Sequence, residues 1–412
     1  MLTVFFRSLL TFKFNDGYFI VIRLLFTLLS IVTVLTLTAC TNISGASKSA
    51  TSLTSFLGFS ELPDWYIRSK YSYPDSKWID NDFGSPIHYR DIGEGPVVVL
   101  LHGEISSLHT WDKWIESLSQ DFRVIAIDLP GSGLTSAPHC IKDPADTCAE
   151  NLTLHYIQHT FEFFIEDLKL EKFSLVGSSY GGYLASLYAL EHPQKLDKLV
   201  LISPLGFQQD IPWILNYVTT SGMDSFNKYI QPATVISTII DDFYGNPANI
   251  KRVNLDRTIH LAQSDGAHAA NVYQLLRVRQ LMEHGMLFDM NDIVTPTLLM
   301  WGKNDSWGSL EHATRWEEDI SDSLLVKYPL AGHALMEELP AESVADAIAF
   351  FTNEPLPSIE GLGLGGTFTV SEAADGFDKE ALFGKATPDD PEAGDSHADQ
   401  EGEETLMEDS PE

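Results

Sequence analysis

The sequence predicts an α/β fold with a mostly parallel sheet, flanking helices and an inserted helical cap. Three observations lead to this prediction. Short apolar runs typical of buried strands alternate with stretches of helical periodicity. One of these runs leads through a Gly-x-Ser-x-Gly turn into a helical stretch. The section from about Phe207 to Phe288 interrupts the alternation, because it has helical patterns but no strand-like run.

Strands are predicted where apolar residues form short runs between helical stretches. These runs are Val97–Leu101, Arg123–Asp128, Phe173–Val176, Leu199–Ile202, Thr297–Trp301 and Leu324–Tyr328. Between the second and third runs, residues 154–168 repeat apolar side chains at helical spacing, which predicts a helix with one buried face. Strands and helices that alternate in this way are typical of a mostly parallel sheet.

The turn at Ser179 has the pattern of a nucleophile elbow. A strand that turns directly into a helix forces its apex residue into strained backbone geometry, so small residues are needed two positions before and after it. Gly177 and Gly181 occupy those positions around Ser179. The strand-like run before the turn and the helical spacing after it favour this interpretation. A tight Gly-rich turn with an incidental serine is the alternative.

The interrupting section, about residues 207–288, is predicted to form a cap over the active site. It lies between two strands expected to be neighbours, and such an insertion sits at the carboxyl ends of the strands, where open α/β folds bind ligands. The aromatic candidates to line a pocket are Trp213, Tyr217, Phe243 and Tyr244. A place in the core is the more frequent position for such side chains, so both interpretations stay open.

A serine at an elbow needs a base, because its hydroxyl is a weak nucleophile until a neighbour takes its proton. In an open α/β sheet, a histidine and the carboxylate that orients it are expected after later strands. Asp305 follows the run Thr297–Trp301, and His333 follows Leu324–Tyr328. Asp305 and His333 are therefore the candidates for these two roles.

Five segments, in this order, resemble the successive signatures of the α/β-hydrolase fold superfamily, and the resemblance covers about residues 71–351. The segments are Val98–Gly103, Asp128–Gly133, the elbow Gly177–Gly181, Trp301–Asp305 and Gly332–His333. Within that superfamily the chain is most similar to capped serine hydrolases, such as carboxylesterases and the hydrolases of meta-cleavage products. The cap prediction and this resemblance agree.

The resemblance implies the roles of five residues. Ser179 would be the nucleophile, His333 the base and Asp305 the acid that orients the histidine. The backbone N–H groups of Tyr180 and Glu104 would form the oxyanion hole. No metal and no organic cofactor is implied.

Glu104 departs from the pattern of serine members, where small or apolar residues commonly follow the His-Gly pair. An acidic side chain that points at a developing oxyanion would be unfavourable, so only its N–H is expected to face the site. We expect the Glu104 side chain to turn outward to a structural partner. His102 is expected to be structural and not catalytic.

Ester hydrolysis is the predicted reaction, on a small-molecule substrate. Dehalogenases and epoxide hydrolases of this fold use aspartate at the elbow, and Ser179 counts against both. A C–C bond hydrolase of the meta-cleavage-product type is the nearest alternative, because it uses the same triad. A non-catalytic binding lipoprotein with this fold is an alternative of a different class.

Charge is distributed unevenly along the 412 residues, whose formal net charge is −32. Such a surface repels nucleic acid. Seventeen acidic residues and two lysines lie between Asn353 and Glu412, so about half of the net charge falls in this segment. With few large apolar residues it is predicted to be a disordered acidic tail, residues 354–412. The tail is interpreted as solvated, with a protein-binding segment as the alternative.

The first 39 residues resemble a secretory leader. Arg7, Lys13 and Arg23 precede an uncharged, mainly apolar run from Leu24 to Leu37. The ending Leu37-Thr38-Ala39-Cys40 is similar to the lipobox of bacterial lipoproteins, which implies that Cys40 is acylated and anchors the chain in the bacterial cell envelope. An uncleaved transmembrane helix is the alternative. Residues 40–62 are predicted to be a flexible tether, and residues 63–353 the folded hydrolase domain.

Cys140 and Cys148 are the only cysteines besides Cys40, and they lie in a loop that contains Pro and Asp. Export makes a disulfide between them plausible, with two free thiols as the alternative. A metal site is not supported, because His139 alone does not complete a set of ligands.

Overall fold

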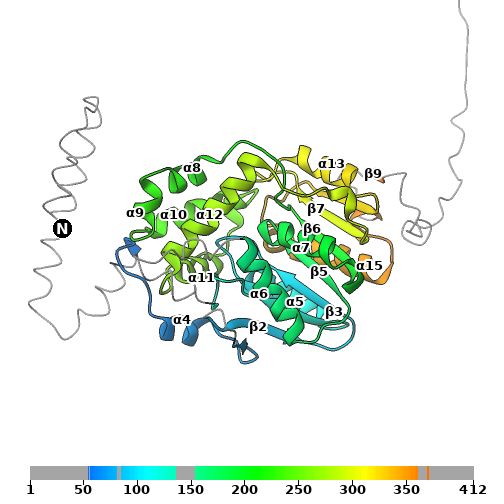
Figure 1. Cartoon of the computed structure of the whole chain (residues 1–412), viewed down its shortest axis with the longest axis horizontal. Coiled ribbons are helices and arrows are strands. Elements are labelled where there is room, and N and C mark those ends of the chain that lie inside the picture. Colours follow the sequence, from blue (N-terminus) through cyan, green and yellow to red (C-terminus); the bar gives the residue numbers. More distant parts are fainter. Residues whose placement is uncertain (1–53, 55, 81–84, 136–153, 361–368, 371–412) are drawn as a thin grey trace, which may run out of the picture.

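The computed structural model describes residues 54, 56–80, 85–135, 154–360 and 369–370 (Figure 1). Within them, one sheet of nine strands has the order β1-β2-β4-β3-β5-β6-β7-β8-β9. The strands are β1 (Lys77–Ile79), β2 (Ile87–Ile92), β3 (Val97–Leu101), β4 (Arg123–Ile127), β5 (Phe173–Ser178), β6 (Leu196–Ile202), β7 (Thr297–Gly302), β8 (Ser323–Tyr328) and β9 (Thr369–Val370).

The centre of the sheet is parallel and its edges are antiparallel. Strands β4, β3, β5, β6, β7 and β8 pair in parallel. Strand β2 runs antiparallel to β4 and β1, and β9 runs antiparallel to β8. The predicted mostly parallel sheet is confirmed, and all six predicted strands are present. Strands β1 and β2 were missed because both are partly exposed and contain polar residues, so neither forms an apolar run.

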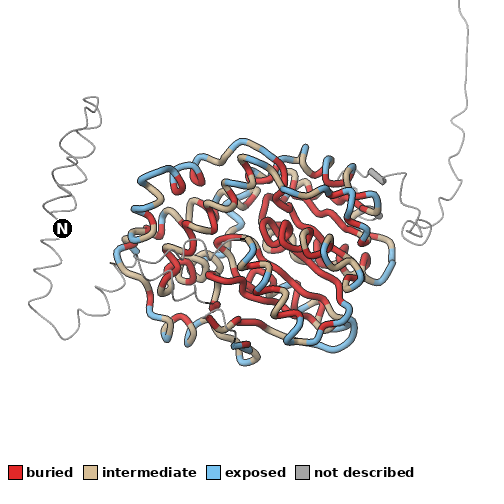
Figure 2. Tube along the Cα trace, viewed as in Figure 1, coloured by how far each residue is buried: buried red, intermediate tan, exposed pale blue. Residues whose placement is uncertain are grey.

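Both faces of the sheet are buried, and alternate residues of each central strand serve opposite faces. In β3, Val98 and Leu100 belong to one apolar cluster, and Val99 and Leu101 belong to the other. Figure 2 shows these central strands as buried along their length. A strand buried on both faces reads as a continuous apolar run, which is why the central strands could be predicted.

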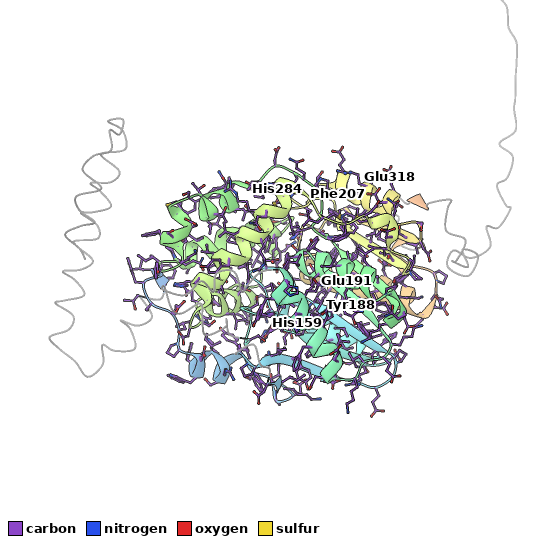
Figure 3. All side chains as sticks on the ribbon, viewed as in Figure 1. His159, Tyr188, Glu191, Phe207, His284 and Glu318 are labelled. Carbon is purple, nitrogen blue, oxygen red and sulfur yellow. The ribbon has the colours of Figure 1, made fainter. Side chains whose placement is uncertain are left out.

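Helices cover the two faces. Side chains of α5 (Asp112–Leu118) and α15 (Pro340–Thr352) join the cluster on one face. The opposite cluster includes side chains of α6 (Leu154–Asp167), α7 (Tyr180–Glu191) and α13 (Leu310–Asp319). Tyr188 of α7, labelled in Figure 3, packs against Phe161 of α6 with ring centroids 5.1 Å apart. The predicted apolar face of α6 is therefore core.

The remaining described helices are short or belong to the segment between β6 and β7. Those between β6 and β7 are α8 (Trp213–Thr219), α9 (Met223–Asn227), α10 (Ala233–Phe243), α11 (Arg252–Ala262) and α12 (Ala267–His284). The 3-10 turns η5 (Pro247–Asn249) and η6 (Met290–Asp292) lie in the same segment. The others are α4 (Asp64–Tyr71), α14 (Leu335–Glu338), α16 (Pro357–Glu360) and the 3-10 turns η1 (Leu108–Trp111) and η4 (Pro193–Lys195).

The helices from α8 to α12 form one group at an end of the sheet, coloured green to yellow-green in Figure 1. Residues 203–296 are all described, and none of them is in a strand. We call the α8–α12 segment the cap. Its apolar side chains, such as Ile236, Leu215 and Leu275, belong to the same cluster as those of α6 and α7. The cap therefore shares its core with the rest of the described fold, which we call the body.

The ordered region is longer at both ends than the predicted limits of 63 and 353. Leu62 is buried and forms a bridge to Ser264, and the Glu61 carboxylate accepts from the N–H groups of Gly266 and His268. These contacts hold Glu61 and Leu62 against the fold, whereas the composition of residues 40–62 predicts a flexible tether. They attach the chain before α4 to the start of α12.

At the other end, the chain continues as part of the fold after Asn353. Leu356 is fully buried, and Ser358 N donates to Asp346 Oδ1 at 2.9 Å. Strand β9 then pairs with the edge strand β8. Leu356 and Ser358 therefore contact the fold, which composition does not predict because a single buried leucine and one edge pairing leave no periodic pattern in an acidic sequence.

Several predictions fall on residues outside the described part of the chain. These are the leader, Cys40, the cysteines Cys140 and Cys148, and most of the acidic tail. Among the described helices, none has the length and apolar character that a membrane crossing requires.

Candidate active site

Ser179 stands at the sharp turn between β5 and α7, with φ 56° and ψ −120°. This is a strained conformation for a residue with a side chain. A Cβ on Gly177 would lie 2.3 Å from Gly181 O, and a Cβ on Gly181 would lie 2.4 Å from His102 O. The two glycines thus allow the strand and helix to approach closely enough to form the turn that holds Ser179.

His333 and Asp305 form a hydrogen-bonded pair at the ends of neighbouring strands. Asp305 follows β7 and His333 follows β8, and His333 Nδ1–H donates to Asp305 Oδ2 at 2.9 Å. Asp305 Oδ1 also accepts from Trp307 N and Gly308 N, each at 2.8 Å. These bonds hold the carboxylate, which in turn orients the imidazole ring with Nε2 as its free nitrogen.

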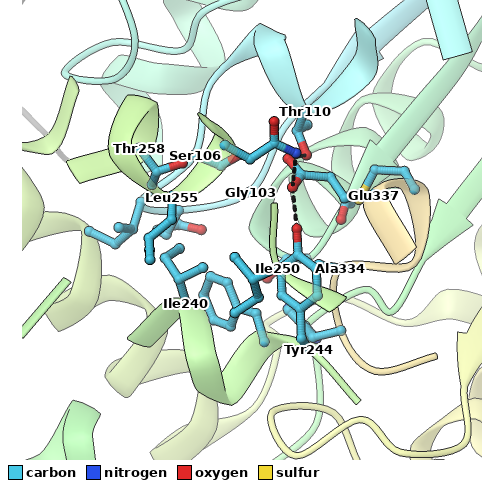
Figure 4. Close-up of a pocket in the computed structure, with 18 residues that line it drawn as sticks. Gly103, Ser106, Thr110, Ile240, Tyr244, Ile250, Leu255, Thr258, Ala334 and Glu337 are labelled. Carbon is cyan, nitrogen blue, oxygen red and sulfur yellow. Dashed lines mark hydrogen bonds between the residues drawn. The ribbon is translucent and has the colours of Figure 1, made fainter. Parts of the chain in front are cut away.

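Both Ser179 and His333 line one pocket, a small cavity of about 50 Å³ (Figure 4). His333 Nε2 is buried and has no hydrogen-bond partner within the described part of the chain. The structure therefore brings the predicted nucleophile, base and acid together at the carboxyl ends of β5, β7 and β8. A free imidazole nitrogen in the pocket of an elbow serine can accept a proton from that hydroxyl.

The cap supplies much of the pocket wall. Its lining residues are Ile240, Phe243, Tyr244, Ile250, Asn254, Leu255 and Thr258. Of the four aromatic candidates, Phe243 and Tyr244 are among them, and the Phe243 ring lies 5.3 Å from the His333 ring. Trp213 is 65% exposed and Tyr217 is 44% exposed, so neither lines this pocket. Both are on α8, whose exposed face they occupy.

Backbone contacts join the end of α10 to the histidine loop. His333 N donates to Phe243 O at 2.7 Å, and the Glu338 carboxylate accepts from Gly332 N and Gly245 N. These hydrogen bonds join the cap to the loop that carries His333, the residue proposed as the base.

Glu337 is a pocket residue that the sequence did not indicate. Its carboxylate accepts from Thr110 Oγ1 on one side, and from Tyr244 and Asn254 of the cap on the other. A glutamate in a short acidic helix is usually exposed to solvent, so no sequence pattern distinguishes Glu337 from the residues beside it. Its carboxylate therefore joins the cap to the body through hydrogen bonds.

The two predicted oxyanion donors lie beside Ser179. Tyr180 begins α7, and the first N–H groups of a helix have no acceptor within the helix. Glu104 follows β3 and lines the same pocket as Ser179. A Cβ on Gly103 would lie 2.9 Å from the Ser179 Cβ, so the Glu104 loop packs directly on the nucleophile.

The side chain of Glu104 is buried and does not turn out to solvent. Its Oε1 lies 3.9 Å from Nη2 of Arg277 on α12, which is a partner within the cap. Burial raises the pKa of the Glu104 carboxyl to about 8, although the Arg277 guanidinium and the residue's own backbone N–H act in the opposite direction. Near neutral pH the carboxyl is therefore largely protonated and adds little negative charge to the site.

His102 is a structural residue, as expected. Its Nε2 accepts from Leu129 N at 3.0 Å, and its Nδ1–H donates to Gly103 O at 2.6 Å. Because Nε2 accepts the hydrogen bond from Leu129 N, it carries no proton, and the ring is neutral. Burial also lowers the pKa of His102, against the opposing effect of Asp128. The ring joins the loop after β3 to the loop after β4.

One cluster among the described residues could hold a metal ion, and it comprises Glu162, Glu191 and His192. None of the three lines the pocket of Ser179. The candidate active site consists of a serine, a histidine, carboxyl groups and backbone N–H groups.

Residues 96–223 match a family model described as the alpha/beta hydrolase fold. This stretch contains the elbow and the Glu104 loop, and the parallel sheet continues beyond it to the pair His333–Asp305. The chain has the α/β-hydrolase fold. The solved structure of an esterase from Exiguobacterium antarcticum has the same fold, with a TM-score of 0.56 at 20% identity, and covers 67% of this chain and 99% of its own.

Curated relatives of this chain include two kinds of hydrolase. A pimeloyl-[acyl-carrier protein] methyl ester esterase of Nitrosomonas europaea is 26% identical, over 63% of this chain and 97% of its own length. A 2-hydroxy-6-oxo-2,4-heptadienoate hydrolase of Pseudomonas putida is 25% identical, over 61% of this chain and 87% of its own length. Esterases and meta-cleavage-product hydrolases are thus both among the homologues.

Proposed function

We propose that the protein is a serine hydrolase that cleaves uncharged carboxylic esters through an acyl-enzyme intermediate. The observation that carries the proposal is the strained Ser179 turn, which shares a pocket with an imidazole whose other nitrogen is held by Asp305. Elbow geometry exposes the hydroxyl and directs helix N–H groups at the oxygen of the carbonyl group that it attacks.

The proposed mechanism uses five residues. Ser179 Oγ attacks the ester carbonyl carbon while His333 Nε2 takes its proton and then gives it to the leaving alcohol. Water next attacks the acyl-enzyme with the same imidazole as base. Asp305 stabilises the imidazolium, and the N–H groups of Tyr180 and Glu104 stabilise the oxyanion of both tetrahedral intermediates.

The charges around the pocket favour an ester over the keto acid of a C–C bond hydrolase. The substrate named for the Pseudomonas putida relative is a dienoate, which carries a carboxylate. Among the described residues that line the present pocket there is no lysine or arginine, whereas Glu337 is there. A substrate carboxylate would lose its water shell without gaining a cation, which is costly.

The test is hydrolysis of p-nitrophenyl esters, from acetyl to palmitoyl, by the purified protein and its Ser179→Ala variant. The variant should lose more than about a thousandfold in kcat/KM, because the nucleophile and base act as a unit. Ser174→Ala, at a buried serine of the same strand that does not line the pocket, is the matched control and should retain turnover. A dienoate keto acid, tested in parallel, should be cleaved more slowly than the best ester.

Two outcomes would contradict the proposal. Cleavage of the keto acid in preference to every ester would assign C–C bond hydrolysis to the site. Absence of turnover, together with no labelling of Ser179 by a fluorophosphonate, would indicate a binding protein with this fold.

We also propose that the enzyme is exported and held in the bacterial cell envelope by a lipid on Cys40. The support is the pattern of the first 40 residues, in which a basic stretch and an apolar run end in Leu-Thr-Ala-Cys.

A further inference from the structure

Two side chains of the cap helix α12 contact the loop that follows β3, which carries the proposed oxyanion donor. Gln274 Oε1 accepts a hydrogen bond from Ile105 N at 3.3 Å. Arg277 lies about one turn further along α12, with Nη2 3.9 Å from Glu104 Oε1. Helix positions three apart share a face, so α12 presents both side chains to consecutive residues of the loop.

Gln274 also holds a second loop. Its Nε2 donates to Gly131 O and to Ser132 Oγ, both at 2.9 Å, in the segment that follows β4. The side chain is only 2% exposed, so these bonds form away from water. The amide oxygen of Gln274 therefore accepts from the loop after β3, and its amide nitrogen donates to the loop after β4. Without that amide, the buried groups that it pairs would each lose a partner.

The loop that Gln274 holds is strained. Ile105 has φ 50°, a left-handed conformation that is unfavourable for a β-branched residue. Such a conformation persists only where the surroundings enforce it. Since Ile105 N is engaged by Gln274, the backbone on its N-terminal side, which includes Glu104 N–H, is fixed relative to Ser179.

We propose that Gln274 is a positioning residue of the oxyanion hole, which holds residues 103–107 in the strained conformation that aims Glu104 N–H at the substrate oxygen. The inference rests on the proposed ester hydrolysis and adds that the cap, besides enclosing the substrate, sets the geometry of the oxyanion hole. Because an oxyanion hole acts most strongly on the transition state, the effect belongs in kcat and not in KM.

The first test compares Gln274→Met with Gln280→Met in the full chain, on the best ester of the p-nitrophenyl series. Gln280 is an exposed glutamine of the same helix and serves as the matched control. Loss of one oxyanion donor costs about a hundredfold or more in kcat, so a misplaced donor should cost about 10- to 100-fold. KM should change by less than about threefold. Thermal unfolding measured beside the kinetics shows whether the variant is folded.

The second test uses Gln274→Glu and remains decisive if Gln274→Met does not fold. A protonated carboxyl is close in shape to the amide and can still donate to Gly131 O. Once ionised, it can no longer donate and it repels that oxygen. The ratio of kcat for this variant to kcat for the native enzyme should therefore fall as pH rises from about 5.5 to 8. The same ratio for Gln280→Glu should stay constant.

The outcomes separate this inference from the proposed function. If native hydrolysis is absent or does not depend on Ser179, both fail together. If hydrolysis depends on Ser179, a kcat for Gln274→Met within twofold of that for Gln280→Met overturns the positioning role alone. A ratio for Gln274→Glu that does not change with pH overturns it as well.

Discussion

Glu104 combines a backbone N–H that the proposed oxyanion hole needs with an acidic side chain that would be unfavourable there if it were ionised. Its backbone N–H is needed where negative charge develops, and its own carboxyl is buried in the same pocket. Burial keeps that carboxyl protonated up to about pH 8. In the acid form it is a neutral hydrogen-bonding group, and only in the ionised form would it oppose the oxyanion.

The first prediction is therefore an alkaline loss of activity. As pH rises through about 8, Glu104 ionises beside the developing oxyanion, so kcat/KM of the native enzyme should fall. Glu104→Gln keeps the backbone donor but cannot ionise, and its kcat/KM should stay level over the same interval. Ester hydrolysis from pH 7 to 9.5 measures both. An equal fall in the two proteins would show that another group is responsible.

At the scale of elements, the turn from β5 into α7 places the nucleophile, and the close approach of strand and helix determines its shape. Gly177 faces the backbone of Gly181 and Gly182, and neither can move without shifting α7. The cap is the second element that matters, because its α10 end is bonded to the histidine loop and its α12 face to the oxyanion loop. The site is thus assembled by contacts between elements far apart in sequence.

The second prediction concerns Gly177→Ala. The added Cβ would lie 2.3 Å from Gly181 O, a backbone atom that cannot rotate away, so the free energy of unfolding should drop by about 1–3 kcal/mol. Turnover should also fall, because the turn that holds Ser179 must open. Gly222→Ala measures backbone strain alone, since its Cβ meets nothing within 4 Å while its φ of 91° disfavours any side chain. Urea denaturation gives both values, and unchanged stability of Gly177→Ala would contradict the steric argument.

For the whole molecule, the stability at acid pH depends on histidines that are buried in neutral form. Burial lowers the pKa of His109 to about 4, although nearby Asp128 opposes the shift. Burial also lowers the pKa of His268 to about 4, against the opposing effect of a Tyr229 backbone group. The unfolded chain takes up protons on these rings near pH 6.5, well before the folded protein does.

The third prediction follows from that difference in proton uptake. As pH falls from about 6.5 to 4, each of the two rings should lower the free energy of unfolding by up to about 1.4 kcal/mol per pH unit. His268→Gln cannot take up a proton, so the slope should be shallower in this variant. His284→Gln, at an exposed histidine of the same helix, should keep the native slope. Equal slopes in all three proteins would exclude His268 as a source of acid sensitivity.

The fourth prediction tests the proposed attachment to the membrane. Cys40→Ala removes the acylated thiol, so the enzyme expressed in a bacterial host should move from the membrane fraction to the soluble fraction and should not incorporate labelled palmitate. Ester hydrolysis per molecule should be unchanged, because Cys40 lies before the described fold. Retention in the membrane without the label would indicate an uncleaved apolar span instead.

The sequence alone was sufficient to predict the central strands, the elbow, the helical insertion and the pair Asp305 and His333. Each of these features is local. A strand buried on both faces is a continuous apolar run, a strained turn requires glycines at fixed positions, and the ends of successive parallel strands meet at one edge. Short stretches of chain therefore carry enough information to predict them.

Only the tertiary structure decided which cap side chains reach the site. Phe243 and Tyr244 line the pocket while Trp213 and Tyr217 lie exposed, although all four are aromatic residues of the same insertion. Gln274 had no sequence signal at all, because its role comes from Ile105, 169 positions earlier. The packing of α12 on the body selects these contacts, and no local pattern encodes which face of a helix will meet a distant loop.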